Sequence, residues 1–155
     1  MLKKMISNSS TALHDAVKLL AGRSLSEKEL LTKLRHKGWE EQEISAALDK
    51  LRLRGYINDE ALCRQLFSAY ISSSKHGLKY ILAKLKNRGL DISLIQDEIV
   101  DYDYQNEYER ALIMAQRKFA RQSEVVQHKI ARFLLTKGFT NSTVVKVINE
   151  ITGQV

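Results

Sequence analysis

A short helix-stop motif recurs along this chain at nearly constant spacing, and it constrains the fold more than any other feature. A basic residue precedes a glycine and a large apolar residue follows it, in Lys37-Gly38-Trp39, Arg88-Gly89-Leu90 and Lys137-Gly138-Phe139. Glycine readily adopts the left-handed conformation that ends helices, and the apolar residue then folds back onto the last turn. The glycines are 51 and 49 residues apart. We therefore expect three copies of one helical unit.

Apolar residues four positions apart precede each stop, in the pairs Leu30/Leu34, Ile81/Leu85 and Ile130/Leu134. Residues at this spacing lie on one face of a helix. A fourth stop of the same kind, Arg54-Gly55-Tyr56, ends another helix. The chain has no proline and seven glycines, which leaves little material for tight β turns. The pattern predicts an all-α fold.

These signals divide the chain into three tandem three-helix repeats, at residues 11–57, 58–103 and 104–152. The expected helices cover residues 11–22, 26–37, 41–54, 59–74, 78–88, 92–102, 105–121, 124–137 and 141–152. A unit of about 50 residues buries too little surface to be very stable alone. Neighbouring units should therefore share apolar surface in an elongated array. Three tyrosines in the acidic segment 97–109 are expected to pack between the second and third repeats.

Helix start signals agree with this division. Two capping boxes are expected, one formed by Ser26 with Glu29 and one by Ser24 with Glu27. Short polar side chains that accept hydrogen bonds from a first helical turn stand before four further helices. These are Asn58 or Asp59, Asp91, Ser123 and Asn141.

The sequence lacks the residue patterns that enzymes and cofactor sites require. No phosphate-binding glycine loop and no glycine-flanked serine nucleophile is present. The four histidines have no ligand partners at zinc spacing. The single cysteine, Cys63, cannot form an internal disulfide and is best explained as a small buried side chain. We expect no enzyme activity, no metal and no cofactor.

The net charge of +7 resides entirely in residues 1–96, where 17 Lys and Arg residues outnumber 10 Asp and Glu residues. This balance favours an anionic partner, either nucleic acid or an acidic protein surface, although solubility alone also explains Lys-rich helices. No secretory signal follows the N-terminal lysines, and no uncharged run approaches the roughly 18 residues of a membrane span. We expect a cytoplasmic protein.

Ten basic residues are candidates for partner contact, and they crowd the middle helix of each repeat and the end of the seventh helix. They are Arg23, Lys33, Lys79, Lys84, Arg88, Arg117, Lys118, Arg121, Lys129 and Arg132. A solvated helix face is the competing explanation for most of them. For Arg88, which directly precedes a stop glycine, favourable interaction with the helix dipole is a further alternative.

Three ordered motifs resemble the RecX family, the bacterial regulators of the RecA recombinase. The first is Arg23-Ser-Leu-Ser-Glu-Lys-Glu-Leu-Leu-Thr-Lys-Leu34, and the second is Gly55-Tyr-Ile-Asn-Asp59. The third is Lys129-Ile-Ala-Arg-Phe-Leu-Leu-Thr-Lys-Gly-Phe139. The likeness covers about residues 12–152 in the same order and spacing.

The resemblance implies an elongated, curved molecule that binds the RecA–DNA filament, within its groove, without a cofactor. It implies inhibition of filament extension, ATP hydrolysis, strand exchange and co-protease activity, and so a limit on recombination and the SOS response. Arg23, Lys129 and Arg132 match the family motifs and are the first functional candidates. In the second repeat, Tyr80 and Lys84 depart from the family pattern.

The residues alone leave other functions open. The segment Leu30–Ile44 also resembles two helices meeting at a glycine turn, as in helix-turn-helix DNA-binding regulators. A plain helical scaffold without a nucleic-acid role is a third alternative. For a RecA-binding protein we expect a monomer, with weak and non-specific DNA contact as a secondary property.

Overall fold

The computed structural model describes residues 11–121 and 127–153, and this part of the chain contains helices and turns but no β-strand. Its helices are α1 (Ala12–Gly22), α2 (Glu27–His36), α3 (Glu41–Leu53), α4 (Asp59–Ser72), α5 (Leu78–Asn87), α6 (Ile92–Ile99), α7 (Tyr104–Phe119), α8 (Gln127–Thr136) and α9 (Asn141–Thr152). The prediction of an all-α fold is confirmed.

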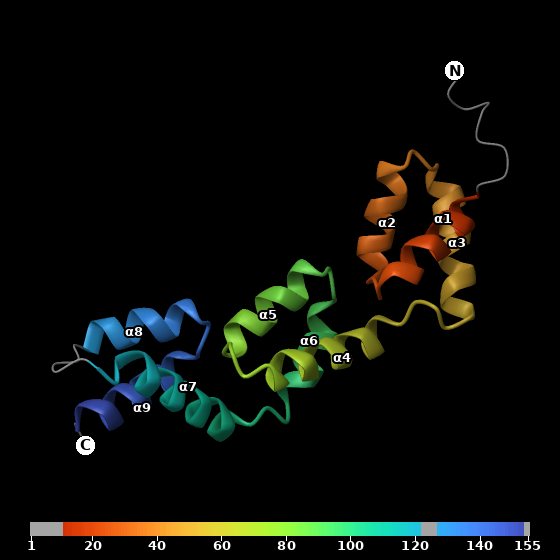
Figure 1. Ribbon diagram of the computed structural model, residues 1–155. Helices are drawn as coiled ribbons and strands as arrows, with labels where there is room; N and C mark the ends of the chain where they lie inside the picture. Colours follow the sequence, from red (N-terminus) through yellow and green to blue (C-terminus); the bar gives the residue numbers. More distant parts are fainter. Residues whose placement is uncertain (1–10, 122–126, 154–155) are drawn as a thin grey trace.

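The helices form three groups that follow one another along an elongated molecule (Figure 1). We refer to α1–α3 as the first unit, α4–α6 as the second unit and α7–α9 as the third unit. Within each unit, every helix contacts the other two. Each unit encloses a separate apolar core, and the residue pairs spaced four apart before the stops are fully buried in these cores, at Leu30/Leu34, Ile81/Leu85 and Ile130/Leu134.

The four stop glycines adopt the left-handed conformation, with φ of +86° at Gly38, +71° at Gly55, +77° at Gly89 and +79° at Gly138. After α2, the Gly38 N–H donates to the carbonyl of Arg35 (2.9 Å) and the next N–H donates to that of Leu34 (3.3 Å). The same pair of hydrogen bonds, which defines the Schellman motif, occurs at the other three stops. The apolar residue after the stop is buried or half-buried in three cases, whereas Tyr56 is 65% exposed.

The predicted helix starts agree with the structure less completely than the predicted helix stops do. Ser26 and Glu29 form the expected capping box, and Asn58 and Asp91 cap α4 and α6. The capping box predicted for Ser24 is wrong, because Ser26 occupies the cap position two residues further on and Glu27 binds Arg52 instead.

The cap predicted for α9 is also displaced. Thr140, and not Asn141, accepts the hydrogen bond from the first turn, and Asn141 is the first helical residue. Its side chain accepts a hydrogen bond from Lys79 of α5 (2.8 Å). The predicted cap Ser123 lies outside the described residues.

A buried carboxylate joins the second and third units. Glu107 of α7 is fully buried, and its oxygens accept hydrogen bonds from the Leu78 N–H (3.0 Å) and from the hydroxyls of Thr140 and Thr143 (2.9 Å each). A buried charge is tolerated only when its lone pairs are satisfied in this way. Glu107 therefore holds the start of α5 against the loop before α9.

A close backbone contact reinforces this junction. The Gly77 N–H donates to the carbonyl of Lys137 (3.0 Å), and the Lys79 N–H donates to that of Gly138 (2.9 Å). A Cβ atom at Gly77 would lie 2.3 Å from the Cα of Phe139, so no larger residue fits there. Gly77 has no side chain to cap α5, and the first turn of α5 is capped by the third unit instead.

The tyrosines near the second junction do not behave alike. Tyr102 is buried in the second core and accepts a hydrogen bond from Arg110 of α7 (3.1 Å), so it links the two units. Tyr104 of α7 is 50% exposed, but its ring meets that of Tyr102 edge-on at 5.0 Å, so it contacts the second unit. The expectation that the tyrosines pack between the units is therefore confirmed for Tyr102 and Tyr104, whereas Tyr108 packs against the third core.

Replacing Gly138 by alanine should destabilise the protein more than replacing Gly38. Both glycines are left-handed, where a Cβ costs roughly 1–2 kcal/mol. At Gly138 the added Cβ would also lie 2.5 Å from the backbone nitrogen of Tyr80, whereas at Gly38 it meets nothing within 4 Å. Urea denaturation of the two variants measures the difference. Equal losses of stability would contradict the close contact between the second and third units.

Candidate functional site

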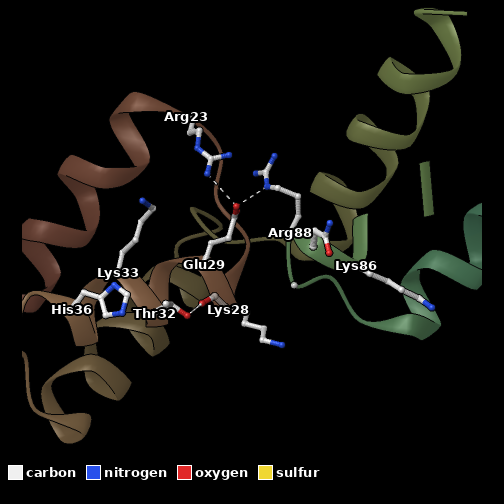
Figure 2. A pocket seen from close by; sticks show the side chains of 10 residues that line it. Arg23, Lys28, Glu29, Thr32, Lys33, His36, Lys86 and Arg88 are labelled. Carbon is white, nitrogen blue, oxygen red and sulfur yellow. Dashed lines mark hydrogen bonds and ion pairs between the residues drawn. The ribbon is translucent and has the colours of Figure 1, made fainter. Parts of the chain in front are cut away.

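A cleft of about 430 Å³ lies between the first and second units, and we call it the basic cleft. Five Lys and Arg side chains line it against a single carboxylate. One wall comes from α2 and the segment before it, and the other from the end of α5 (Figure 2). The lining residues are Arg23, Lys28, Glu29, Thr32, Lys33, His36, Lys86, Asn87, Arg88 and Gly89.

An ion-pair network crosses the basic cleft and ties its two walls together. The Oε1 atom of Glu29 lies 2.7 Å from the Arg88 Nε and 3.1 Å from an Arg23 Nη2, so it is shared between the units (Figure 2). Arg88 also donates from Nη2 to the carbonyl of Ser24 (2.7 Å), and the Ser26 hydroxyl donates to the carbonyl of Arg88. Arg88 therefore fastens the second unit to the first.

The network keeps Glu29 ionised. Burial raises the pKa of the Glu29 carboxyl, but the hydrogen bond from the Ser26 N–H (3.0 Å) and the charges of Arg88 and Arg23 outweigh burial. The net effect is a pKa below the ordinary value for a glutamate. Glu29 is thus an anion with both oxygens engaged at neutral pH.

A second polar contact lies at the same junction. Asp59 of α4 accepts a hydrogen bond from the Glu27 N–H (3.0 Å), which adds a cap to the first turn of α2. The Glu27 carboxylate in turn receives two hydrogen bonds from Arg52 of α3 (2.7 and 2.6 Å), and these hydrogen bonds lower its pKa. Burial raises the pKa of Asp59.

The lysines of the basic cleft have no such partners. Within the described ranges, the ammonium groups of Lys28, Lys33 and Lys86 make no ion pair or hydrogen bond. Lys28 and Lys33 are exposed along α2, and Lys86 is exposed near the end of α5. The positive charge of the cleft is therefore only partly compensated by Glu29.

The structure brings three of the ten predicted basic residues together in this cleft, namely Arg23, Lys33 and Arg88. Lys28, His36 and Lys86 belong to the same cleft and were not predicted as site residues. Their position depends on contact between the first and second units, which no local sequence pattern reports.

The other predicted residues lie elsewhere. Lys79 binds Asn141, and Lys84 lies over the ring of Tyr80 at 5.3 Å from its centroid. Arg117 lines a separate cavity of about 320 Å³ beside α7. Four further residues are exposed on the third unit, at Lys118, Arg121, Lys129 and Arg132. The candidates therefore spread over all three units.

A stacked aromatic pair stands among the basic residues of the second unit. The rings of His76 and Tyr80 are 3.6 Å apart and nearly parallel. Burial, followed by the nearby charges of Lys137, Lys75 and Lys84, lowers the pKa of His76. The neutral imidazole thus stacks beside cations without adding to their charge.

In residues 11–121 and 127–153, no group of three His, Cys, Asp or Glu side chains could hold a metal ion. Cys63 is buried, and burial raises the pKa of its thiol, so it is not an activated nucleophile. No helix in these ranges is both long and apolar enough to cross a membrane.

Comparison with known proteins shows the family to which the chain belongs. Residues 12–51 match the family model described as RecX, first three-helix domain, and residues 105–148 match the model for RecX, third three-helix domain. The two matches together cover more than half of the chain. The chain belongs to the RecX family.

Individual RecX proteins agree with this assignment. The chain is 32% identical to the regulatory protein RecX of Legionella pneumophila (strain Corby) over 143 residues, covering 90% of this chain and 94% of the relative. It is 28% identical to the regulatory protein RecX of Geobacillus thermodenitrificans, of which it spans 54%. The crystal structure of RecX from Lactobacillus salivarius superimposes with a TM-score of 0.81 at 27% identity, covering 91% of this chain and 94% of that one.

The ion-pair network of the basic cleft lies in a chain with the three-helix domains of the RecX family. The chain is a regulatory protein, and this agrees with the expectation from its sequence that it is not an enzyme. The stretch from Arg23 to Leu34, which resembles the family in sequence, supplies one wall of the basic cleft together with His36.

Glu29→Gln should lower the free energy of unfolding at neutral pH by about 1–3 kcal/mol, because it removes charge-assisted hydrogen bonds. The pKa of Glu29 is depressed in the folded state, so its contribution is present above the unfolded value near 4.5 and is lost as the pH falls through the folded pKa. Thermal unfolding of both proteins from about pH 6 down to about pH 3 tests this, since their stabilities should converge in acid.

Glu60→Gln is the matched control for this experiment. Glu60 forms an exposed ion pair with Arg64 on the surface of α4, and such pairs contribute little. A constant difference between the wild type and Glu29→Gln across the acid range would refute the role of the Glu29 charge.

Proposed function

We propose that this chain is a negative modulator of RecA, which binds the RecA–DNA filament as a monomer in the cytoplasm. Binding would inhibit filament extension, ATP hydrolysis, strand exchange and co-protease activity, and would limit recombination and the SOS response. RecX membership and the resemblance of the motifs support this proposal. We further propose that residues 11–57, 58–103 and 104–152 act as three domains, each with its own core.

The observation that carries the proposal is the distribution of positive charge along an elongated molecule. Candidate cations lie on all three units, in the basic cleft, on α5, at the end of α7 and on α8. An elongated target such as a nucleoprotein filament can engage such a surface along its whole length. Charge complementarity of this kind promotes association and sets orientation.

The alternative of a helix-turn-helix regulator has weaker support. In that arrangement α3 of the first unit would enter the major groove of DNA with its N-terminal residues foremost. The start of α3 carries Glu40, Glu41 and Glu43, whose charges would repel the phosphates. A basic recognition helix is therefore lacking in the first unit.

An assay of RecA ATP hydrolysis on single-stranded DNA distinguishes the two functions. Inhibition at less than one chain per RecA monomer supports the filament modulator. Tight binding to one duplex sequence, without an effect on RecA, supports the DNA-binding regulator and refutes the proposal.

Charge reversal at Arg117, Lys118 and Arg121 should weaken inhibition of RecA and preserve helicity. The three residues are exposed at and just after the end of α7. We expect the half-inhibitory concentration to rise about tenfold or more, since three reversals of roughly 0.5 kcal/mol each amount to about 1.5 kcal/mol, and about 1.4 kcal/mol corresponds to a factor of ten. The ATPase assay measures inhibition, and far-UV circular dichroism measures helicity.

A variant with Lys18, Lys50 and Lys146 replaced by glutamate changes the net charge equally and serves as the control. These lysines are exposed on α1, α3 and α9 and are not among the candidates. Unchanged inhibition by the first variant, or an equal loss in both, would remove the end of α7 from the interface.

A further inference from the structure

The basic cleft holds more positive charge than the junction between the first and second units needs. Among the described residues, Glu29 is the one carboxylate that pairs with Arg23 and Arg88, and its pairing with Arg88 joins the units. Lys28, Lys33 and Lys86 take no part in that pairing, although they line the same cleft. We propose that the basic cleft binds the phosphodiester backbone of nucleic acid through these three lysines, without reading the bases. The site is argued from the residues that line the cleft, whereas its role in a RecA–DNA filament rests on the proposed function.

The first argument is electrostatic. Five Lys and Arg side chains surround one carboxylate in a cleft of about 430 Å³. Both Glu29 oxygens are already engaged, by Arg23 and Arg88 on one side and by the Ser26 N–H on the other. Cations gathered in a concave surface raise its potential and attract anions. The lysines therefore favour an anion from outside the chain.

The second argument concerns the kind of anion. Apart from its charged side chains, the basic cleft is lined by Thr32, His36, Asn87 and Gly89, and its lining includes no large aliphatic residue and no Phe, Tyr or Trp. A bound peptide needs apolar anchors, and nucleic-acid bases need aromatic platforms on which to stack. The lining residues include no apolar anchor, and His36 supplies their one aromatic ring. Phosphate oxygens need only cations and hydrogen-bond donors, and this lining supplies them.

The third argument is that the two walls are held in place before a ligand arrives. The stem of Lys28 packs against Gly89, where an added Cβ would lie 2.8 Å from the Lys28 side chain. Arg88 meets Glu29 across the cleft, and Figure 2 shows Lys28 extending from one wall and Lys86 from the other, both below this ion pair in the view. Binding at a site that is already formed loses less entropy than binding at one that must be assembled.

The test uses the full chain without RecA. A variant with Lys28, Lys33 and Lys86 replaced by glutamine is compared with a control in which Lys18, Lys50 and Lys146 are replaced by glutamine. Fluorescence anisotropy measures binding to labelled single-stranded oligonucleotides of two unrelated sequences over a series of salt concentrations. Circular dichroism and thermal unfolding verify that both variants are folded, which the exposure of all six lysines favours.

We expect the cleft variant to lose affinity on the order of a hundredfold at about 0.1 M salt. The slope of log affinity against log salt should fall by about 2, since each lost contact to a single strand removes about 0.7. The control should bind nearly as the wild type does, and both sequences should bind alike. Unchanged binding by the cleft variant, equal losses in both variants, or preference for one sequence would overturn the proposal.

Two further measurements distinguish a nucleic-acid site from a site for acidic protein, and the cleft proposal from the proposed function. If labelled polyglutamate binds the wild type at least as tightly as the oligonucleotide does at an equal concentration of charges, and the cleft variant loses affinity for both, the cleft is a site for acidic protein and the proposal fails. The RecA ATPase assay is run on the same proteins. Inhibition of RecA without lysine-dependent DNA binding would sink only the cleft proposal, whereas lysine-dependent DNA binding without any inhibition would sink only the proposed function.

Discussion

The backbone geometry at four glycines determines the rest of this structure. A left-handed residue ends a helix wherever it occurs, so the helices that end at these stops remain short, with 10 residues each in α2, α5 and α8 and 13 in α3. Three short helices enclose a small core, and a unit of that size gains little stability by itself. Contacts between neighbouring units therefore contribute to the fold as well as to its shape.

The two junctions between units stabilise these small units through different kinds of contact. At the first, the ion pair between Arg88 and Glu29 crosses from one unit to the other and is largely buried, with 18% and 16% of the side chains exposed, and hydrogen bonds from Arg88 and Ser26 to backbone carbonyls accompany it. At the second, Glu107 is fully buried, and the backbone N–H groups of Gly77 and Lys79 donate directly to the carbonyls of Lys137 and Gly138. The first junction thus depends mainly on contacts of charged side chains, and the second on a buried carboxylate and backbone contacts. Positive charge collects at the first junction, where the basic cleft opens.

A contact could be predicted from the sequence when the residues that form it lie close together along the chain, and not when they lie far apart. Stops and most caps involve residues within five positions of one another, and for that reason the positions of Gly38, Gly89 and Asn58 could be interpreted directly. Asp59 and Glu107 cap the preceding unit across 32 and 29 residues, and no periodicity predicts these contacts. The cleft was only partly predicted for the same reason, because Lys28 and Lys86 come together only when two units pack.

The middle helices α2 and α5 share an arrangement in which the following unit supplies hydrogen-bond acceptors to their first turns. For α2 the loss of Asp59 would leave Ser26 as a cap of its own, but α5 has only Gly77 before it. When the chain is divided into fragments, each unit should therefore be kept together with the unit that follows it and caps its middle helix. A fragment that keeps the second unit must also keep the third, while the first unit can be removed at the cost of contacts that water replaces.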